Sequence, residues 1–203
     1  MAKGQGKGKG GEFERKMCKI LSLWWSESDN GRNDIFWRTS QSGGRATERK
    51  KKGMKTAGSY GDMMAIHESG KPFERFILTE FKKGYDKDIG VLLLIDGRQK
   101  EPVLLKWWKK NEKIKRESNR KFGILIFERN RRHPCIMMDE VLFSCLEQYA
   151  GIWKMSNLIQ IDFVSIDSTL IIVPLYPFLE WCSSESMKLF IEGKKQWKKK
   201  KFT

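Results

Sequence analysis

Residues 60–82 read YGDMMAIHESGKPFERFILTEFK, and this stretch decides the fold. Apolar residues stand on both sides of a turn at 68–72, where Ser, Gly and Pro interrupt the pattern, so the stretch predicts a hairpin of two strands. A hairpin folded about residue 71 places Asp62 across from Glu80, with Cβ atoms roughly 5 Å apart. Because side chains alternate along a strand, Glu80 and Lys82 point to the same face.

Two carboxylates this close repel each other, and the repulsion raises the pKa of one of them unless a cation lies between them. Mg²⁺ suits such a pocket because it takes a few carboxylates and keeps several waters. Lys82 adds a cation that can hold a metal-bound water or help to deprotonate it. The three side chains therefore predict a site for metal-assisted phosphodiester hydrolysis. The alternative is a surface hairpin with an ordinary Glu–Lys pair, since Glu-x-Lys also occurs often by chance.

The chain has 203 residues, a mass of 23.8 kDa and a formal net charge of +15. The positive charge is concentrated in four segments: residues 1–11 (+3), 45–55 (+5), 106–132 (+8) and 188–203 (+6). Segment 133–187 is acidic instead, with a net charge of −6. Gathered basic residues favour a nucleic-acid partner, because each phosphate that they neutralise releases counterions. The alternative is a set of solvated arms with no specific partner.

Composition excludes several classes of protein. No apolar run approaches the ~20 residues that a membrane span needs, and residues 1–11 lack the apolar stretch of a secretory signal. The four cysteines form no Cys-x-x-Cys pair and there are only two histidines, which argues against a zinc ribbon or finger. We expect reduced cysteines, a cytoplasmic location and no membrane partner.

The spacing of apolar residues predicts an α/β protein in the form of an α+β sandwich. Helices are expected at residues 12–25, 102–120, 139–149 and 184–192, with Asp139 as the N-cap of the third. Strands are expected at residues 35–38, 60–67, 73–82, 122–127, 135–138, 158–163 and 169–173. The Gly- and Lys-rich stretch 41–59 predicts a long mobile loop.

The chain resembles the PD-(D/E)xK nuclease superfamily, and within it the archaeal-type Holliday junction resolvases with their phage and plasmid relatives. The resemblance covers roughly residues 10–130. It is carried in order by Gly11-Glu12-Phe13-Glu14-Arg15, Trp37-Arg38-Thr39, Ser42-Gly43-Gly44, Gly61-Asp62 and Glu80-Phe81-Lys82. It implies a restriction-endonuclease-like αβββαβ core with a mixed central sheet, followed by a C-terminal α+β extension. The residue before Asp62 is Gly where the superfamily often has Pro.

The resemblance also implies roles for individual residues. Asp62, Glu80 and the backbone carbonyl of Phe81 are implied as metal ligands, and Lys82 as the residue that positions or activates the attacking water. Glu14 is similar to the helix glutamate that completes the catalytic and metal site, with Glu12 as a rival for that role. Arg15 and Arg38 are similar to the phosphate-binding arginines of the superfamily, and Ser42 lies in the matching Arg–Ser–Gly stretch. The charge pattern adds Arg45 of the basic loop, and Lys109 and Lys110 of a predicted helix that interleaves Trp with Lys, as further expected nucleic-acid contacts. Surface charge pairing is an equal alternative for Arg15.

We expect a flexible basic arm (1–11), a nuclease core (12–138) with a mobile basic loop (45–58), a C-terminal extension of the same domain (139–192) and a basic tail (193–203). The function predicted is a Mg²⁺-dependent endonuclease, with Mn²⁺ as a substitute, that acts as a homodimer on branched DNA in the manner of a Holliday junction resolvase. The alternatives are a restriction-like or general duplex nuclease, a nuclease for RNA, and a non-catalytic nucleic-acid-binding protein on the same fold.

Overall fold

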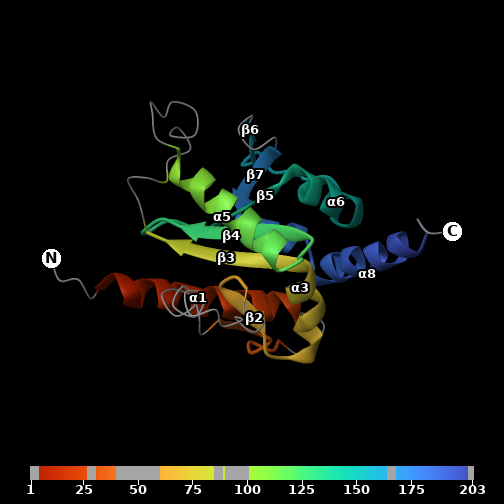
Figure 1. Cartoon of the computed structure of the whole chain (residues 1–203), viewed down its shortest axis with the longest axis horizontal. Helices are drawn as coiled ribbons and strands as arrows, with labels where there is room; N and C mark the ends of the chain where they lie inside the picture. The colour runs from red at the N-terminus through yellow and green to blue at the C-terminus, as the bar shows by residue number, and fades with distance from the viewer. Residues whose placement is uncertain are drawn as a thin grey trace.

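The computed structural model describes residues 5–26, 31–39, 60–84, 89, 101–163 and 168–200, and gives residues 5–9 and 194–200 by their helical backbone alone. Its centre is a five-stranded sheet in the order β3-β4-β5-β7-β6 (Figure 1). β3 and β4 run parallel, and the other neighbouring strands run antiparallel. The strands are β3 (Ile77–Lys83), β4 (Phe122–Glu128), β5 (Cys135–Asp139), β6 (Ile159–Phe163) and β7 (Ser168–Pro174).

Six α-helices lie among the described residues. They are α1 (Gln5–Trp25), α3 (Lys71–Phe76), α5 (Val103–Glu117), α6 (Glu140–Ala150), α7 (Leu175–Trp181) and α8 (Ser184–Lys200). α1 and α5 cover opposite faces of the sheet (Figure 1). Two short antiparallel strands, β1 (Phe36–Arg38) and β2 (Met63–Ala65), form a separate sheet beside α1. The arrangement confirms the predicted α+β fold with a mixed central sheet. None of the described helices has the length and apolar character that crossing a membrane requires.

The core has two layers because β4 is buried on both faces. Ile124 and Ile126 of β4 belong to the larger cluster, which also takes the apolar stripe of α1 and side chains of α6, α7 and α8. Leu125 and Phe127 point the other way, toward Trp108 of α5. Successive side chains of a strand face opposite layers, so a central strand with both faces covered becomes an uninterrupted apolar run.

Residues 60–82 do not form the predicted hairpin, because the two strands are joined by helical turns and do not pair with each other. Residues 68–76 form a 3₁₀ turn (Glu68–Gly70) followed by α3, and β2 pairs with β1 instead of β3. Pro72 lies in the first turn of α3, where its missing N–H costs no helical hydrogen bond. The residue type that suggested a turn therefore starts a helix, and the returning strand begins at Ile77, four residues later than expected.

The remaining elements follow the predicted order with three further corrections. α1 begins at Gln5, within the stretch expected as a flexible arm, and α7 was not predicted. α8 does not end at residue 192 but runs to Lys200, within the stretch expected as a basic tail. Pro177 is the third residue of α7, a position that again needs no N–H donor, so the Pro-containing stretch is helical. Asp139 caps α6 as predicted, its side chain accepting a hydrogen bond from the N–H of Leu142 at 2.6 Å. The predicted loop 41–59 lies outside the described residues.

Candidate active site

β3 is one of the two outer strands of the main sheet, and one of its edges pairs with no other strand of the described residues; we call this the open edge of β3. The segment that carries Asp62 lies along this edge. The backbone N–H of Asp62 donates to the carbonyl of Thr79 at 2.9 Å. In return, the N–H of Phe81 donates to Oδ2 of Asp62 at 2.8 Å. These two bonds fix the Asp62 carboxylate beside the centre of β3, so the predicted neighbourhood of Asp62 and Glu80 exists without a hairpin.

Gly61 is required by this close approach. Its φ is +76°, in the left-handed region, and a Cβ at this position would lie 2.7 Å from the backbone oxygen of Thr79. Proline has its φ fixed near −65° and cannot adopt this conformation. The glycine before Asp62, which departs from the superfamily pattern, is therefore explained by how this chain packs against β3.

Three oxygen atoms converge on the ammonium group of Lys82. Nζ donates to Oε2 of Glu80 at 2.8 Å and to the carbonyl of Phe81 at 3.0 Å, and it lies 3.4 Å from Oδ2 of Asp62. The N–H and C=O of one strand residue point to the same side. The Phe81 carbonyl therefore faces the edge at which Asp62 receives the Phe81 N–H. The two carboxylates and this carbonyl are thus already arranged around one cation.

This donor set fits a divalent metal. Glu80 and Asp62 are 4% and 8% exposed, and all three donors are oxygens, as Mg²⁺ prefers. Within the described part of the chain, no three His, Cys, Asp or Glu side chains group closely enough to hold a metal by themselves. A metal here would therefore take two carboxylates and one carbonyl, and would complete its shell with water.

Burial and the neighbouring charges of the cluster, two carboxylates around one ammonium group, shift the pKa values of Glu80 and Lys82. Burial, and then the charge of Asp62, raise the pKa of Glu80, while Lys82 and Lys110 act to lower it. Burial acts to lower the pKa of Lys82, but Asp62 and Glu80 outweigh it, so the pKa of Lys82 lies above its ordinary value. Lys82 is therefore a charged donor in this arrangement.

Glu14 lies on α1 and is paired with Arg38 instead of being grouped with the carboxylates of the cluster. Its Oε2 lies 3.1 Å from Nε of Arg38, while Glu12 is exposed on the same helix. The charges of Glu14, Asp62 and Arg38 all act on the buried thiol of Cys18, so the three side chains lie in the same region. Burial, then Glu14, then Asp62 raise the pKa of Cys18 to about 12, and Arg38 acts to lower it. The structure thus brings Glu14 and Arg38 to the side of Asp62, as an ion pair.

The other predicted nucleic-acid contacts separate into three groups. Arg15 is exposed on α1. Lys109 forms an ion pair with Glu101 at 2.5 Å, whereas Lys110 is exposed and its charge acts on Glu80. Ser42 and Arg45 lie outside the described residues. Lys110 is therefore the member of the predicted pair that lies toward the cluster.

The prediction overlooked a longer basic stripe on α5. Lys106, Lys110 and Lys113 are all exposed and follow the helical spacing i, i+4, i+7, which places them on one face. Among the described residues, none of the three has an ion-pair partner. The helical spacing of the lysines is visible in the sequence and could have identified the stripe. Trp108, by contrast, is 1% exposed and belongs to the core.

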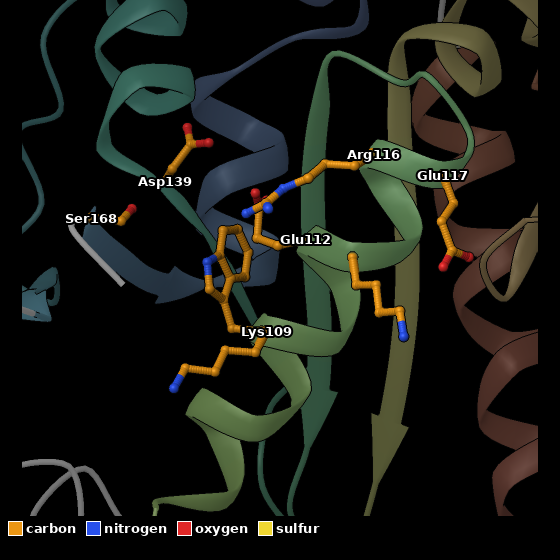
Figure 2. Close-up of a pocket in the computed structure, with 8 residues that line it drawn as sticks. Lys109, Glu112, Arg116, Glu117, Asp139 and Ser168 are labelled. Atoms are coloured by element: carbon orange, nitrogen blue, oxygen red, sulfur yellow. The ribbon is translucent and has the colours of Figure 1, made fainter. Parts of the chain in front are cut away.

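A separate cleft of about 460 Å³ lies on a flank of α5 (Figure 2). Its lining consists of Trp108, Lys109, Glu112, Lys113, Arg116, Glu117, Asp139 and Ser168. Three cations and three carboxylates leave the lining with no formal net charge, and no residue of the Asp62–Glu80–Lys82 cluster takes part. The cleft therefore lacks the positive charge that a phosphate site needs, and the open edge of β3 remains the candidate site.

Comparison with protein families gives a match over most of the chain. The model of a family described as phage putative PDDEXK endonuclease matches residues 5–176. No curated protein and no solved structure matches the chain. The matched range runs from the start of α1 into α7, well beyond residue 130, and it includes every residue of the carboxylate cluster.

Proposed function

This chain belongs to the family of phage putative PDDEXK endonucleases, and on that premise we propose that it hydrolyses DNA phosphodiester bonds with a divalent metal. The observation that carries the proposal is the convergence of Asp62, Glu80 and the Phe81 carbonyl on one cationic group. Mg²⁺ fits the three oxygen donors best, and Mn²⁺ accepts the same ligands. The cluster lies at the edge of β3, and Lys110 of the α5 stripe is near enough for its charge to act on Glu80.

Each residue of the cluster has a proposed task. Asp62, Glu80 and the Phe81 carbonyl would hold the metal, which when bound polarises the phosphate and lowers the pKa of a bound water. A metal on these three oxygens would take the present place of the Lys82 ammonium group. Lys82 would keep its proton and donate a hydrogen bond that orients the attacking water. Asp62 also fixes the backbone of β3 through the Phe81 N–H, so the ligands are ordered before DNA arrives.

The substrate proposed is branched DNA, cut by a homodimer. Two cuts on opposite strands of a symmetric junction need two active sites, and a two-fold dimer supplies them. The first alternative is a restriction-like or general duplex nuclease, which would use the same cluster to cut linear DNA. A non-catalytic binding protein is the remaining alternative, but such a protein has no need to keep two carboxylates and a lysine buried together, which is costly without a function.

The test is cleavage at low salt with Mg²⁺, offered a four-way junction, a flapped duplex and a linear duplex of matching sequence. We expect wild-type cleavage, and loss of cleavage with retained DNA binding for Glu80→Ala and for Lys82→Ala. Glu12→Ala, which removes an exposed carboxylate from α1, is the matched control and should stay active.

The outcomes separate the alternatives. Paired symmetric cuts in the junction alone support a resolvase, and cuts in the linear duplex move the assignment to a duplex nuclease. An active Glu80→Ala enzyme contradicts the proposed site. Tight DNA binding without cleavage in either Mg²⁺ or Mn²⁺ contradicts nuclease function and leaves the binding protein.

A further inference from the structure

The guanidinium group of Arg38 lies against a gap in the surface of α1. A Cβ at Gly11 would lie 2.7 Å from Nη1 of Arg38, 3.4 Å from Cζ and 3.7 Å from Nη2. Real Cβ atoms do not approach other atoms as closely as the first of these distances. The missing side chain of Gly11 is therefore the space that the Arg38 guanidinium occupies.

Glu14 fixes the same guanidinium from its other end. Residues 11 and 14 are one helical turn apart and share a face of α1. Oε2 of Glu14 lies 3.1 Å from Nε of Arg38, and the Glu14 side chain is 15% exposed. The Arg38 side chain is 30% exposed. The half-buried carboxylate of Glu14 thus holds Arg38 at Nε, and the Nη atoms of Arg38 occupy the space beside Gly11. Part of the Arg38 side chain remains open to solvent.

The position of Arg38 relative to the cluster follows from β1. Arg38 pairs with Met63 in the β1–β2 ladder. The next residue, Thr39, donates its N–H to the carbonyl of Asp62 at 3.1 Å and its hydroxyl to the carbonyl of Gly61 at 2.9 Å. Any shift of the Arg38 side chain therefore occurs beside the residues that would hold the metal.

We propose that Gly11 and Glu14 are positioning residues, which hold the Arg38 fork so that it binds a phosphate oxygen of the DNA strand being cut. The proposal rests on the nuclease function proposed above. It gives Glu14 a role through Arg38, in place of the direct metal ligation that the resemblance implies. A planar guanidinium matches two phosphate oxygens only when its orientation is fixed, which is what the gap and the ion pair provide.

Glycine in a helix interior is less favourable than alanine. Alanine at residue 11 would therefore favour the helix, and a loss of activity in that variant would come from its contact with Arg38. Gly10 supplies the contrast, because a Cβ there would have no atom within 4 Å. The two neighbouring glycines therefore form a matched pair, of which Gly11 alone contacts Arg38.

The test compares Gly11→Ala with Gly10→Ala. Both substitutions favour the helix equally, and the Arg38 fork, at the end of a flexible side chain, can move aside, so both proteins should fold. We expect Gly11→Ala to lower kcat/KM for DNA cleavage about 10- to 100-fold, the effect of losing one charged hydrogen-bond contact. Gly10→Ala should match the wild type.

A double-mutant cycle makes the test specific. With Arg38→Ala present, the gap at residue 11 is empty, so Gly11→Ala should have no further effect. An equal loss from Gly11→Ala in both backgrounds, or equal activity of the two glycine variants in the wild-type background, overturns the proposal.

Glu14→Gln separates positioning from metal ligation. If Glu14 acts through Arg38, Glu14→Gln should weaken DNA binding measured in Ca²⁺, as Gly11→Ala does, and leave the Mg²⁺ concentration for half-maximal cleavage unchanged. A rise in that Mg²⁺ concentration for Glu14→Gln alone would assign Glu14 to the metal and overturn its positioning role. A wild-type protein that cuts no DNA would contradict the proposed function itself, which is a different result from any of these.

Discussion

Gly61 sets the position of the most important carboxylate without taking part in its chemistry. Its positive φ and its contact with the Thr79 oxygen allow the chain to turn onto β3 immediately before Asp62. A residue with a side chain at this point must either push the segment away from β3 or strain the backbone. In both cases the Asp62 carboxylate moves away from the Phe81 N–H that holds it.

We therefore expect Gly61→Ala to destabilise the protein by more than the roughly 1–2 kcal/mol that a positive φ alone costs, because its Cβ would also meet the Thr79 oxygen, and to reduce cleavage strongly. Gly31→Ala is the control: the φ of Gly31 is +67°, but a Cβ there meets no atom within 4 Å. The control should show only the cost of the positive φ and keep its activity. Equal free energies of unfolding for the two variants, measured by urea denaturation, would show that the contact with Thr79 is unimportant.

At the scale of elements, α5 connects the cluster to the positive charge of the molecule. The stripe Lys106–Lys110–Lys113 spans roughly 10 Å of helix, and the charge of Lys110 acts on Glu80. A DNA backbone that reaches the open edge of β3 therefore passes a row of exposed lysines. The contribution of such contacts to DNA-binding affinity falls as the salt concentration rises, because each contact releases counterions.

Replacing Lys106 and Lys113 together with alanine should weaken DNA binding and reduce the slope of log K against log salt by about 2, close to one per lost phosphate contact. Lys154→Ala removes an exposed lysine of the acidic segment and should leave the slope unchanged. Fluorescence anisotropy of labelled duplex DNA over a range of KCl concentrations measures the affinity and its salt dependence for each variant. An unchanged slope for the double variant would remove α5 from the DNA path.

Some of the helices and strands could be predicted from local sequence signals, and others could not. The helices α1, α5 and α6 and the strands β4 and β5 follow from apolar periodicity and from the Asp139 cap, which are local signals. The hairpin failed because Pro72 favours both a turn and the first turn of a helix, and only the packing of Phe73 in the core distinguishes them. α7 was missed for the same reason at Pro177.

The proximity of Asp62, Glu80 and Lys82 was predicted from the sequence, but the path of the chain between Asp62 and Glu80 was not. Asp62 and Glu80 meet because β3 has an open edge that accepts the Asp62 segment, and which strand is outermost is decided by long-range pairing. The contact of Gly11 with Arg38 was equally invisible, since residues 27 apart in sequence meet only in the folded chain. Local sequence thus indicated the chemistry, and tertiary structure supplied the geometry.

At the scale of the whole molecule, charge limits how two copies can meet. Two chains that each carry +15 repel each other unless they associate through their least basic surfaces. Segment 133–187, with a net charge of −6, is the least basic of these segments of the chain. It also exposes apolar side chains, with Val141 at 63% and Ile152 at 74%. We expect this face to form the proposed homodimer.

Analytical ultracentrifugation of the wild type should then give twice 23.8 kDa, and Ile152→Glu should shift the protein toward the monomer without unfolding it. Ile66→Glu is a matched control, because Ile66 is 53% exposed but follows β2, outside the acidic segment. Monomeric wild-type protein at micromolar concentration, or dissociation by Ile66→Glu alone, would contradict the expected dimer face.

The bonds between Asp62 and β3 have a consequence for how an inactive protein should be made. An uncovered outer strand offers its free N–H groups to strands of other molecules and promotes aggregation, and the Asp62 carboxylate occupies the Phe81 N–H that would otherwise be available. Asp62→Ala would therefore remove activity and solubility together. Asp62→Asn keeps an oxygen acceptor for that N–H, and Glu80→Ala leaves it untouched, so these variants should remain soluble enough for crystallisation with uncut DNA.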